Sequence, residues 1–165
     1  MLTLLKIIVD TSTLISLERV DLIKLLNKVD YKIIIPKAVE KEIRFTYKLK
    51  NIEVVELVGR SLKKSNDLEK LGIDKGEAQC CVLAKKLRLK FIICDDRKFI
   101  RQRFFLDKQF NGINIVGFSF FLHIFYRRNL IKDVWSYFNK IINLNHWERS
   151  EVQIVNYIFL KELGY

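Results

Sequence analysis

Residues 91–99 read FIICDDRKF, a short strand-like run that ends in two aspartates and leads into two basic residues. Similar apolar runs rich in Ile and Val recur along the chain: LLKIIV (4–9), YKIII (31–35), EVVEL (53–57) and INIV (113–116). Stretches with helical spacing lie between these runs, which is the pattern of parallel strands joined by crossover helices. The sequence therefore predicts an α/β fold, in which layers of helices pack on a central parallel sheet.

The composition is that of a basic chain with enough apolar residues for a core. Of the 165 residues, 50% are hydrophobic and 12 are Phe, which argues against intrinsic disorder. Thirty Lys and Arg residues against 19 Asp and Glu residues give a net charge of +11, which favours a polyanionic partner such as nucleic acid. No Ser/Gly-rich linker or repeat divides the chain, so we expect a single domain over residues 1–165.

The cysteines and the apolar segments indicate the cellular setting. Cys80, Cys81 and Cys94 form no CxxC pair, which argues against a zinc site or a disulfide framework and for a reducing compartment. The most apolar stretch, INIVGFSFFLHIFY (113–126), is well short of the roughly 20 residues that cross a bilayer. The first ten residues lack the pattern of a signal peptide. We therefore expect a cytoplasmic protein with no membrane partner.

The character of the chain changes after Gly117. Three aromatic-rich helical patterns follow, FSFFLHIFYRRNL (118–130), IKDVWSYFNKIINL (131–144) and ERSEVQIVNYIFLKEL (148–163), with no strand between them. We expect a motif-bearing core over residues 1–117, with the helices of residues 118–165 packed on it. Four aromatic residues of these helices are expected to make packing contacts rather than bind a ligand: Trp135, Phe138, Trp147 and Tyr157.

Six carboxylates lie where the predicted strands end or where the following helices begin: Asp10, Glu40, Glu42, Glu77, Asp95 and Asp96. In a parallel sheet all such positions share one edge, and that edge is where such folds bind ligands. Several carboxylates brought close together raise one another's pKa unless a cation relieves the repulsion. A cluster of oxygen ligands suits Mg²⁺ or Mn²⁺.

Each of these carboxylates also has a structural explanation. Asp10 precedes two hydroxyl residues and is suited to cap a helix, and DKGE (74–77) is a capping-box pattern. Asp95 and Asp96 would complement the positive end of the next helix dipole. Capping does not, however, require four separate segments of a basic chain to deliver acid to the same edge.

The second strand leads into a helix with two acids in its first turns. Pro36 is suited to the first helical position and opens the predicted helix PKAVEKEIRFTYKL (36–49). Glu40 and Glu42 flank the apolar stripe of this helix on opposite shoulders. Helical periodicity therefore does not choose between them.

Four motifs follow one another along the chain: IIVDTSTLI (7–15), IPKAVEKEI (35–43), GEAQCCVLA (76–84) and IICDDRKF (92–99). In order and spacing they resemble the PIN-domain ribonucleases, in the branch with a GEAxx third motif and a DD fourth motif. The resemblance covers roughly the first 117 residues, and Gly117 after INIV fits a branch whose fifth strand ends in a glycine turn. It implies a three-layer α/β/α sandwich and metal-dependent hydrolysis of single-stranded RNA that leaves a 5′ phosphate.

The resemblance also implies roles for individual residues. The catalytic acids are Asp10, Glu42, Glu77 and Asp96. The same four residues and Asp95 bind Mg²⁺ or Mn²⁺, and Thr11 and Ser12 support the site. Glu42 fits better than Glu40, because the acid of the second motif follows the helix-opening proline by six positions. Gln79 stands where members with a GEAEA-like motif have a second acid, and Cys94 stands where many members have Thr.

Basic segments flank the acidic edge, over KKLRLK (85–90) and RKFIRQRFF (97–105). The residues expected to contact RNA are Lys85, Arg97, Lys98 and Arg101. Such contacts would be salt-sensitive and largely blind to sequence, although solvated helix faces explain the same runs.

Several functional alternatives stay open. A non-catalytic PIN-like module for RNA binding or assembly fits the same fold. A receiver-type domain fits less well, because it requires its acid pair after the first strand and here Asp10 stands alone. The resemblance is compatible with a toxin restrained by an antitoxin protein and with a processing enzyme, and it implies a homodimer.

Overall fold

The computed structural model describes residues 4–43, 48–105 and 112–165, and it confirms the α/β architecture. Five parallel strands form one sheet in the order β3-β2-β1-β4-β5. They are β1 (Leu5–Val9), β2 (Tyr31–Pro36), β3 (Ile52–Val55), β4 (Phe91–Ile93) and β5 (Asn114–Val116). Each strand lies at one of the five apolar runs of the sequence.

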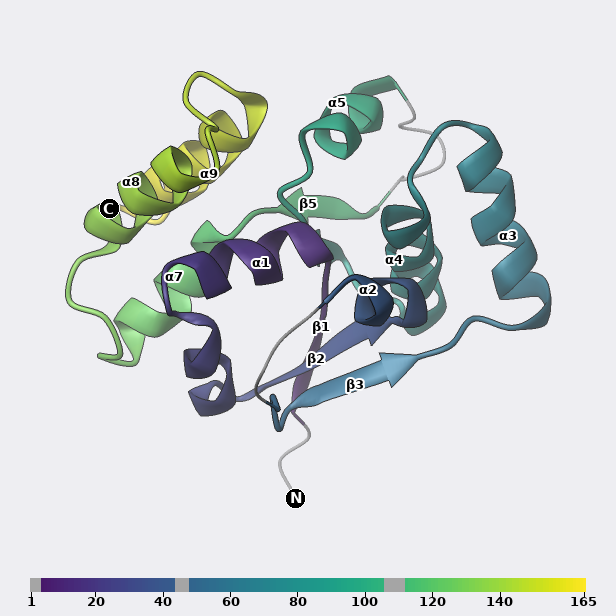
Figure 1. Cartoon of the computed structure of the whole chain (residues 1–165), viewed down its shortest axis with the longest axis horizontal. Coiled ribbons are helices and arrows are strands. Elements are labelled where there is room, and N and C mark those ends of the chain that lie inside the picture. Colours follow the sequence, from purple (N-terminus) through teal and green to yellow (C-terminus); the bar gives the residue numbers. More distant parts are fainter. Residues whose placement is uncertain (1–3, 44–47, 106–111) are drawn as a thin grey trace.

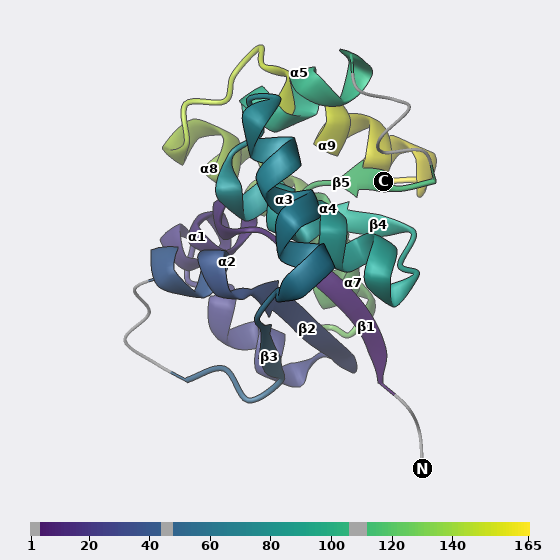
Figure 2. The same cartoon turned by 90° about the vertical axis from the view of Figure 1, so that its right-hand side faces the viewer.

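Helices cover both sides of this sheet, as the three-layer sandwich requires. They are α1 (Thr11–Arg19), the 3-10 helix η1 (Ile23–Lys28), α2 (Lys37–Glu42), α3 (Gly59–Lys70), α4 (Lys75–Leu87), α5 (Arg97–Phe105), α7 (Ser119–Arg127), α8 (Val134–Leu144) and α9 (Glu151–Glu162). In Figure 1, α3 and α4 lie to the right of the sheet, whereas α7, α8 and α9 lie to the left. Figure 2 shows α3 lying over α4, which itself contacts β1, β2 and β4.

Strand β1 occupies the centre of the sheet, and its last three side chains are buried there. Ile8 is fully buried and pairs with Ile34 of β2 and Ile92 of β4. Burying an aliphatic side chain of this size contributes about 1.5–3 kcal/mol. The ladder continues one residue beyond the strand, where the Asp10 backbone N–H donates to the Ile93 carbonyl at 2.8 Å. The chain after β1 and the chain after β4 therefore meet at one edge.

Helix α2 is shorter than the sequence predicts. Pro36 is the last residue of β2 and the N-cap of α2, one position before the helix. The helix ends at Glu42, because Ile43 has an extended backbone (φ −79°, ψ 128°). The prediction of a helix over 36–49 is wrong at Ile43 and at residues 48 and 49, and residues 44–47 lie outside the described residues.

The predicted capping box at the start of α4 does not form. Asp74 is the N-cap residue, but its side chain makes no capping hydrogen bond to the helix. Its carboxylate instead accepts from Lys98 Nζ at 2.6 Å. Asp74 thus links the start of α4 to α5 through this ion pair, and Glu77 does not take part in a capping box.

The three helical patterns of the C-terminal segment are confirmed as α7, α8 and α9. The aromatic residues predicted to make contacts do so: Trp135 packs on Phe138 and Tyr157, and Trp147 stacks on Phe118. Helix α9 contacts α7, α5 and β5. Within the described ranges, none of the helices has the length and apolar character needed to span a membrane.

Candidate metal centre

Asp10 lies at the centre of the acidic edge. It follows β1 and caps α1, with Oδ2 accepting from the Ser12 backbone N–H at 3.2 Å and from Ser12 Oγ at 3.0 Å. The Cys94 thiol also donates to Oδ2, at 3.6 Å. The residue is 3% exposed. Capping therefore fixes the orientation of Asp10 through one oxygen and does not exclude a role for the other.

Two further residues bring ligand atoms to Asp10. Glu77 comes from the first turn of α4 and is 8% exposed, and Cys94 follows β4 and is fully buried. Ligand atoms of Asp10, Glu77 and Cys94 all lie within 4.8 Å of one another. Segments that are distant in sequence thus converge on one small volume.

Glu42, rather than Glu40, lies beside this cluster. Its Oε2 accepts from Thr11 Oγ1 at 2.7 Å, so the Thr11 hydroxyl supports Glu42. Glu40 instead forms a surface ion pair with Lys37. Helical periodicity did not distinguish these two acids. Their contacts in the structure do, because Glu42 binds Thr11 and Glu40 binds Lys37.

Gly76 allows the start of α4 to approach both carboxylates. A Cβ atom at this position would lie 3.3 Å from Asp10 Oδ1 and 3.6 Å from Glu42 Oε1. Glycine at this position of the GEA motif therefore lets the backbone of α4 lie close to the two carboxylates.

The carboxyl groups are held close enough to perturb one another. Burial raises the pKa of Asp10, and the charge of Glu42 raises it further. Burial and then the charge of Asp10 raise the pKa of Glu77 to about 8, with a smaller contribution from Asp96. A carboxyl group with this pKa is mostly protonated at neutral pH, so the metal-free cluster does not carry its full negative charge.

These residues fit a divalent cation. Carboxylate oxygens are the ligands that Mg²⁺ and Mn²⁺ prefer, and both ions are compatible with Asp10, Glu42 and Glu77. The raised pKa of Glu77 shows that the described surroundings do not compensate the negative charge of the cluster. A bound cation would supply that compensation and favour the ionised carboxylates.

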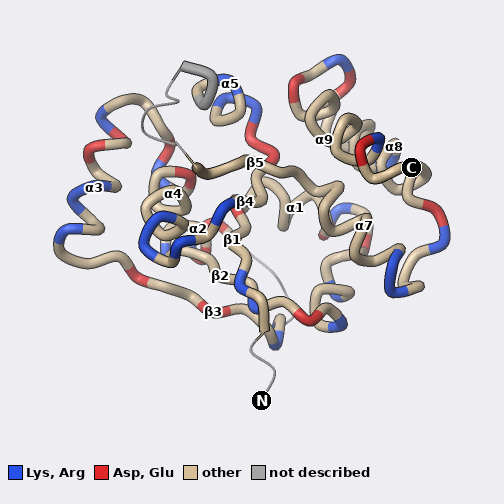
Figure 3. The backbone as a smooth tube through the Cα atoms, turned by 180° about the vertical axis from the view of Figure 1, so that it is seen from behind, with Lys and Arg blue, Asp and Glu red and all other residues tan. Residues whose placement is uncertain are grey.

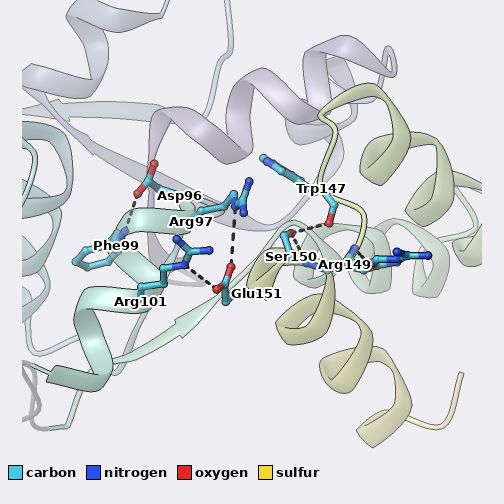
Figure 4. A network of polar contacts seen from close by, with 9 residues as sticks. Asp96, Arg97, Phe99, Arg101, Trp147, Arg149, Ser150 and Glu151 are labelled. Atoms are coloured by element: carbon cyan, nitrogen blue, oxygen red, sulfur yellow. Dashed lines mark hydrogen bonds and ion pairs between the residues drawn. The ribbon is translucent and has the colours of Figure 1, made fainter.

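Asp96 and Asp95 have different environments although they are adjacent. Asp96 Oδ1 accepts from the Phe99 backbone N–H at 2.7 Å and so caps α5 (Figure 4). Its charge also contributes to the raised pKa of Glu77, so Asp96 acts on the cluster electrostatically. From the sequence, Asp95 was predicted to bind the metal or to cap the next helix. In the structure the residue that caps this helix is Asp96.

The carboxylate of Asp95 is occupied by protein donors. Thr13 Oγ1 donates to Oδ2 at 2.6 Å, and the Phe118 backbone N–H donates to the same oxygen at 3.0 Å. Asn156 Nδ2 donates to Oδ1 at 2.9 Å. Burial raises the pKa of Asp95 to about 6 in spite of these hydrogen bonds. Asp95 is thus a buried link to α1, α7 and α9, and the charge of Asp10 contributes to its raised pKa.

Asn156 is a site-supporting residue that the sequence reading missed. Besides its bond to Asp95, its amide accepts from the Ser119 backbone N–H at 2.8 Å and donates to the Val152 carbonyl at 2.9 Å. A Cβ at Gly117 would lie 2.3 Å from the Asn156 amide. The available signals were an asparagine within the apolar pattern IVNYIFL (154–160) and the absence of a side chain at Gly117.

Three of the four predicted RNA-binding residues form exposed ion pairs. Lys98 pairs with Asp74 at 2.6 Å, and Arg101 and Arg97 lie 2.6 and 3.9 Å from Glu151 (Figure 4). Exposed pairs of this kind contribute about 0–1 kcal/mol, so a phosphate group could replace the carboxylate partner.

The fourth predicted RNA-binding residue, Lys85, lies farther from the acids. It belongs to the last turn of α4, eight residues after Glu77, or about 12 Å along the helix axis. Figure 3 shows that Lys and Arg residues are spread along α3, α4 and α5. The basic surface is therefore broader than the predicted residues.

The fold and the cluster together define an α/β domain with a cluster of buried acidic side chains at the carboxyl edge of its sheet. A family model described as a PIN domain matches residues 6–156, which is most of the chain. The chain belongs to the PIN domain family, whose members are in general nucleases that use divalent metals. The match extends past residue 117 and includes the C-terminal helices as far as Asn156. The comparisons with curated proteins and with solved structures found no match.

Proposed function

We propose that this chain is a metal-dependent endoribonuclease that hydrolyses single-stranded RNA with the help of Mg²⁺ or Mn²⁺. The observation that carries the proposal is the convergence of Asp10, Glu77 and Cys94 within 4.8 Å, in a member of the PIN domain family. A purely structural role does not explain a buried carboxyl group whose pKa is raised to about 8. Strongly perturbed carboxyl groups at a ligand-binding edge are typical of functional sites.

The residues that would hold the ion are Asp10, Glu42, Glu77 and Asp96. When bound, a divalent ion activates water and stabilises negative charge that develops on a phosphate. Ser12 fixes the orientation of Asp10, and Thr11 fixes that of Glu42. The Glu77 carboxyl releases its proton when the ion binds, because its negative form is then stabilised.

The substrate assignment draws on charge and on the family. A net charge of +11 favours a polyanion, and the basic residues beside the cluster are engaged only in weak surface pairs. RNA, rather than another polyanion, is the substrate that the motif resemblance implies. The toxin role, the antitoxin partner and the homodimer stay predictions.

The test is cleavage of single-stranded RNA in the presence of Mn²⁺ by the native chain, Asp10→Asn and Glu162→Gln. We expect Asp10→Asn to bind RNA without cutting it, whereas Glu162→Gln, a change at an exposed position of α9, should cut like the native chain. Products should carry a 5′ phosphate. Equal cleavage by native and Asp10→Asn protein would refute the site assignment. RNA binding by native protein without Mn²⁺-dependent cleavage would favour the non-catalytic module.

A further inference from the structure

A cavity of about 310 Å³ adjoins the candidate metal centre. It lies between α2, the segment that leads into α3, and α4, and Glu42 contributes to its wall. Glu42 also accepts the Thr11 hydrogen bond beside Asp10, so one side chain borders both the cavity and the acidic cluster. The volume is at the lower end of ligand pockets, which range over ~300–1,000 Å³. A larger cavity of about 620 Å³ between α3 and α4 shares no lining residue with the cluster.

Three lysines surround this small cavity: Lys37, Lys41 and Lys75. Lys37 pairs with Glu40. Lys41 and Lys75 are exposed and make no hydrogen bond or ion pair with other described residues. Lys75 is also the first residue of α4, where the helix dipole favours a negative charge. Two cationic groups beside a helix N-terminus therefore face the cavity, and they outnumber Glu56, its one lining carboxylate outside the candidate metal centre.

Gln79 adds a positioned hydrogen-bond donor to the same cavity. Its side chain is 5% exposed, and its Oε1 accepts from the Ala38 backbone N–H at 3.2 Å. Because a backbone N–H can bond only to the amide oxygen, this contact fixes which end of the amide is which. Gln79 Nε2 is then the donor available to a molecule in the cavity. This is the position where a GEAEA-like motif would have a carboxylate, which repels anions.

The rest of the lining is partly apolar. Leu57 is buried and Leu62 is exposed, and both line the cavity. An apolar surface next to cations and one amide donor suits a nucleotide, whose base is flat and weakly polar and whose phosphate is anionic.

We propose that this cavity binds the nucleotide adjacent to the cleaved phosphodiester bond of single-stranded RNA. Lys41 and Lys75 contact its phosphate, Gln79 Nε2 donates to an oxygen of its sugar or base, and Leu57 and Leu62 pack against the base. The cavity is placed for this role because Glu42 separates it from the metal centre by a single side chain. The identification of the neighbouring bond as the cleaved one rests on the proposed nuclease function, whereas the binding itself does not.

The test is RNA binding without metal. Fluorescence anisotropy with a labelled oligouridylate, in EDTA, compares native protein with Lys41→Ala, Lys75→Ala and Gln79→Glu. The matched control is Lys63→Ala, which removes the same charge from an exposed position of α3 outside the cavity lining. We expect each cavity lysine variant to bind about fivefold more weakly than the control. The slope of log K against log salt should also fall by about 0.7 for each lost phosphate contact.

Gln79→Glu places a carboxylate against the phosphate and should weaken binding about tenfold or more. Because Gln79 is buried, circular dichroism melting checks its fold, and the two exposed lysines provide a test that does not depend on it. Affinities and salt slopes of Lys41→Ala and Lys75→Ala equal to those of Lys63→Ala would overturn the proposal. Weakened binding by these variants, in a protein that does not cut RNA with Mn²⁺, would support the cavity and refute the nuclease.

Discussion

Glu77 should make the metal-free protein less stable as the pH rises, and Glu77→Gln should remove that loss. Burial and the charge of Asp10 raise the pKa of Glu77 from 4.5 to about 8. A carboxyl group with a higher pKa in the folded chain binds a proton that the unfolded chain has already released. Its stabilising effect is therefore fully present below pH 4.5 and is lost as the pH rises to about 8.

The size of this loss follows from the shift. At ~1.4 kcal/mol per pH unit, the native protein should lose about 3–4 kcal/mol of unfolding free energy between pH 5 and pH 8. This is a large part of the ~5–15 kcal/mol that stabilises an ordinary domain. The amide introduced by Glu77→Gln has no proton to lose. In urea denaturation with EDTA, this variant should therefore match native protein near pH 5 and be about 3 kcal/mol more stable at pH 8.

Adding Mn²⁺ at pH 8 should remove most of the stability difference between the two proteins. An ion at 100 times its dissociation constant stabilises the native state by about 2.7 kcal/mol, and the variant should gain much less because it lacks one carboxylate ligand. Glu162→Gln, an exposed change, should follow native protein throughout. The reasoning is refuted if native protein and Glu77→Gln keep the same stability difference at pH 5 and pH 8 in EDTA.

Three matched experiments test the remaining assignments. Glu42→Gln should abolish the rise in melting temperature that Mn²⁺ causes, and Glu40→Gln should keep it; equal responses would remove Glu42 from the site. Gly117→Ala places a methyl group 2.4 Å from Asp95 Oδ1 and should cost about 1–3 kcal/mol or more in urea denaturation, so an unchanged midpoint would contradict the packing. Asp95→Asn should lower stability by about 1–3 kcal/mol and keep the Mn²⁺ response, whereas Asp96→Asn, which retains a good capping residue, should keep stability and lose the response. The opposite pattern would exchange their roles.

The fold could be predicted because its signals are strong and local. Short Ile/Val-rich runs separated by helical patterns specify a parallel sheet, and the end of each strand follows from the first polar residue after it. The meeting of Asp10 with the chain after β4 followed from this topology. The length of α2 did not, because the extended conformation of Ile43 has no signal in the helix-forming residues around it.

The details of the site depended on contacts between distant residues. The DKGE pattern is locally a capping box, but Asp74 binds Lys98 of another helix, and no local pattern reports that partner. Successive residues of an extended chain point to opposite sides, so one of Asp95 and Asp96 had to face away from the cluster. Which one did so was decided by Thr13 and Asn156, two residues outside the motif.

The link between Asp95 and Asn156 has a consequence for the timing of activity. The two residues are 61 positions apart, and the bond holds the chain just after β4, directly before Asp96. During synthesis, all four motifs leave the ribosome before Asn156 has been added. A growing chain thus carries every acid of the site before Asp95 gains its hydrogen bond from α9. In an enzyme that cuts RNA, the chain after β4 would therefore be fully held only once α9 has formed and packed against the sheet.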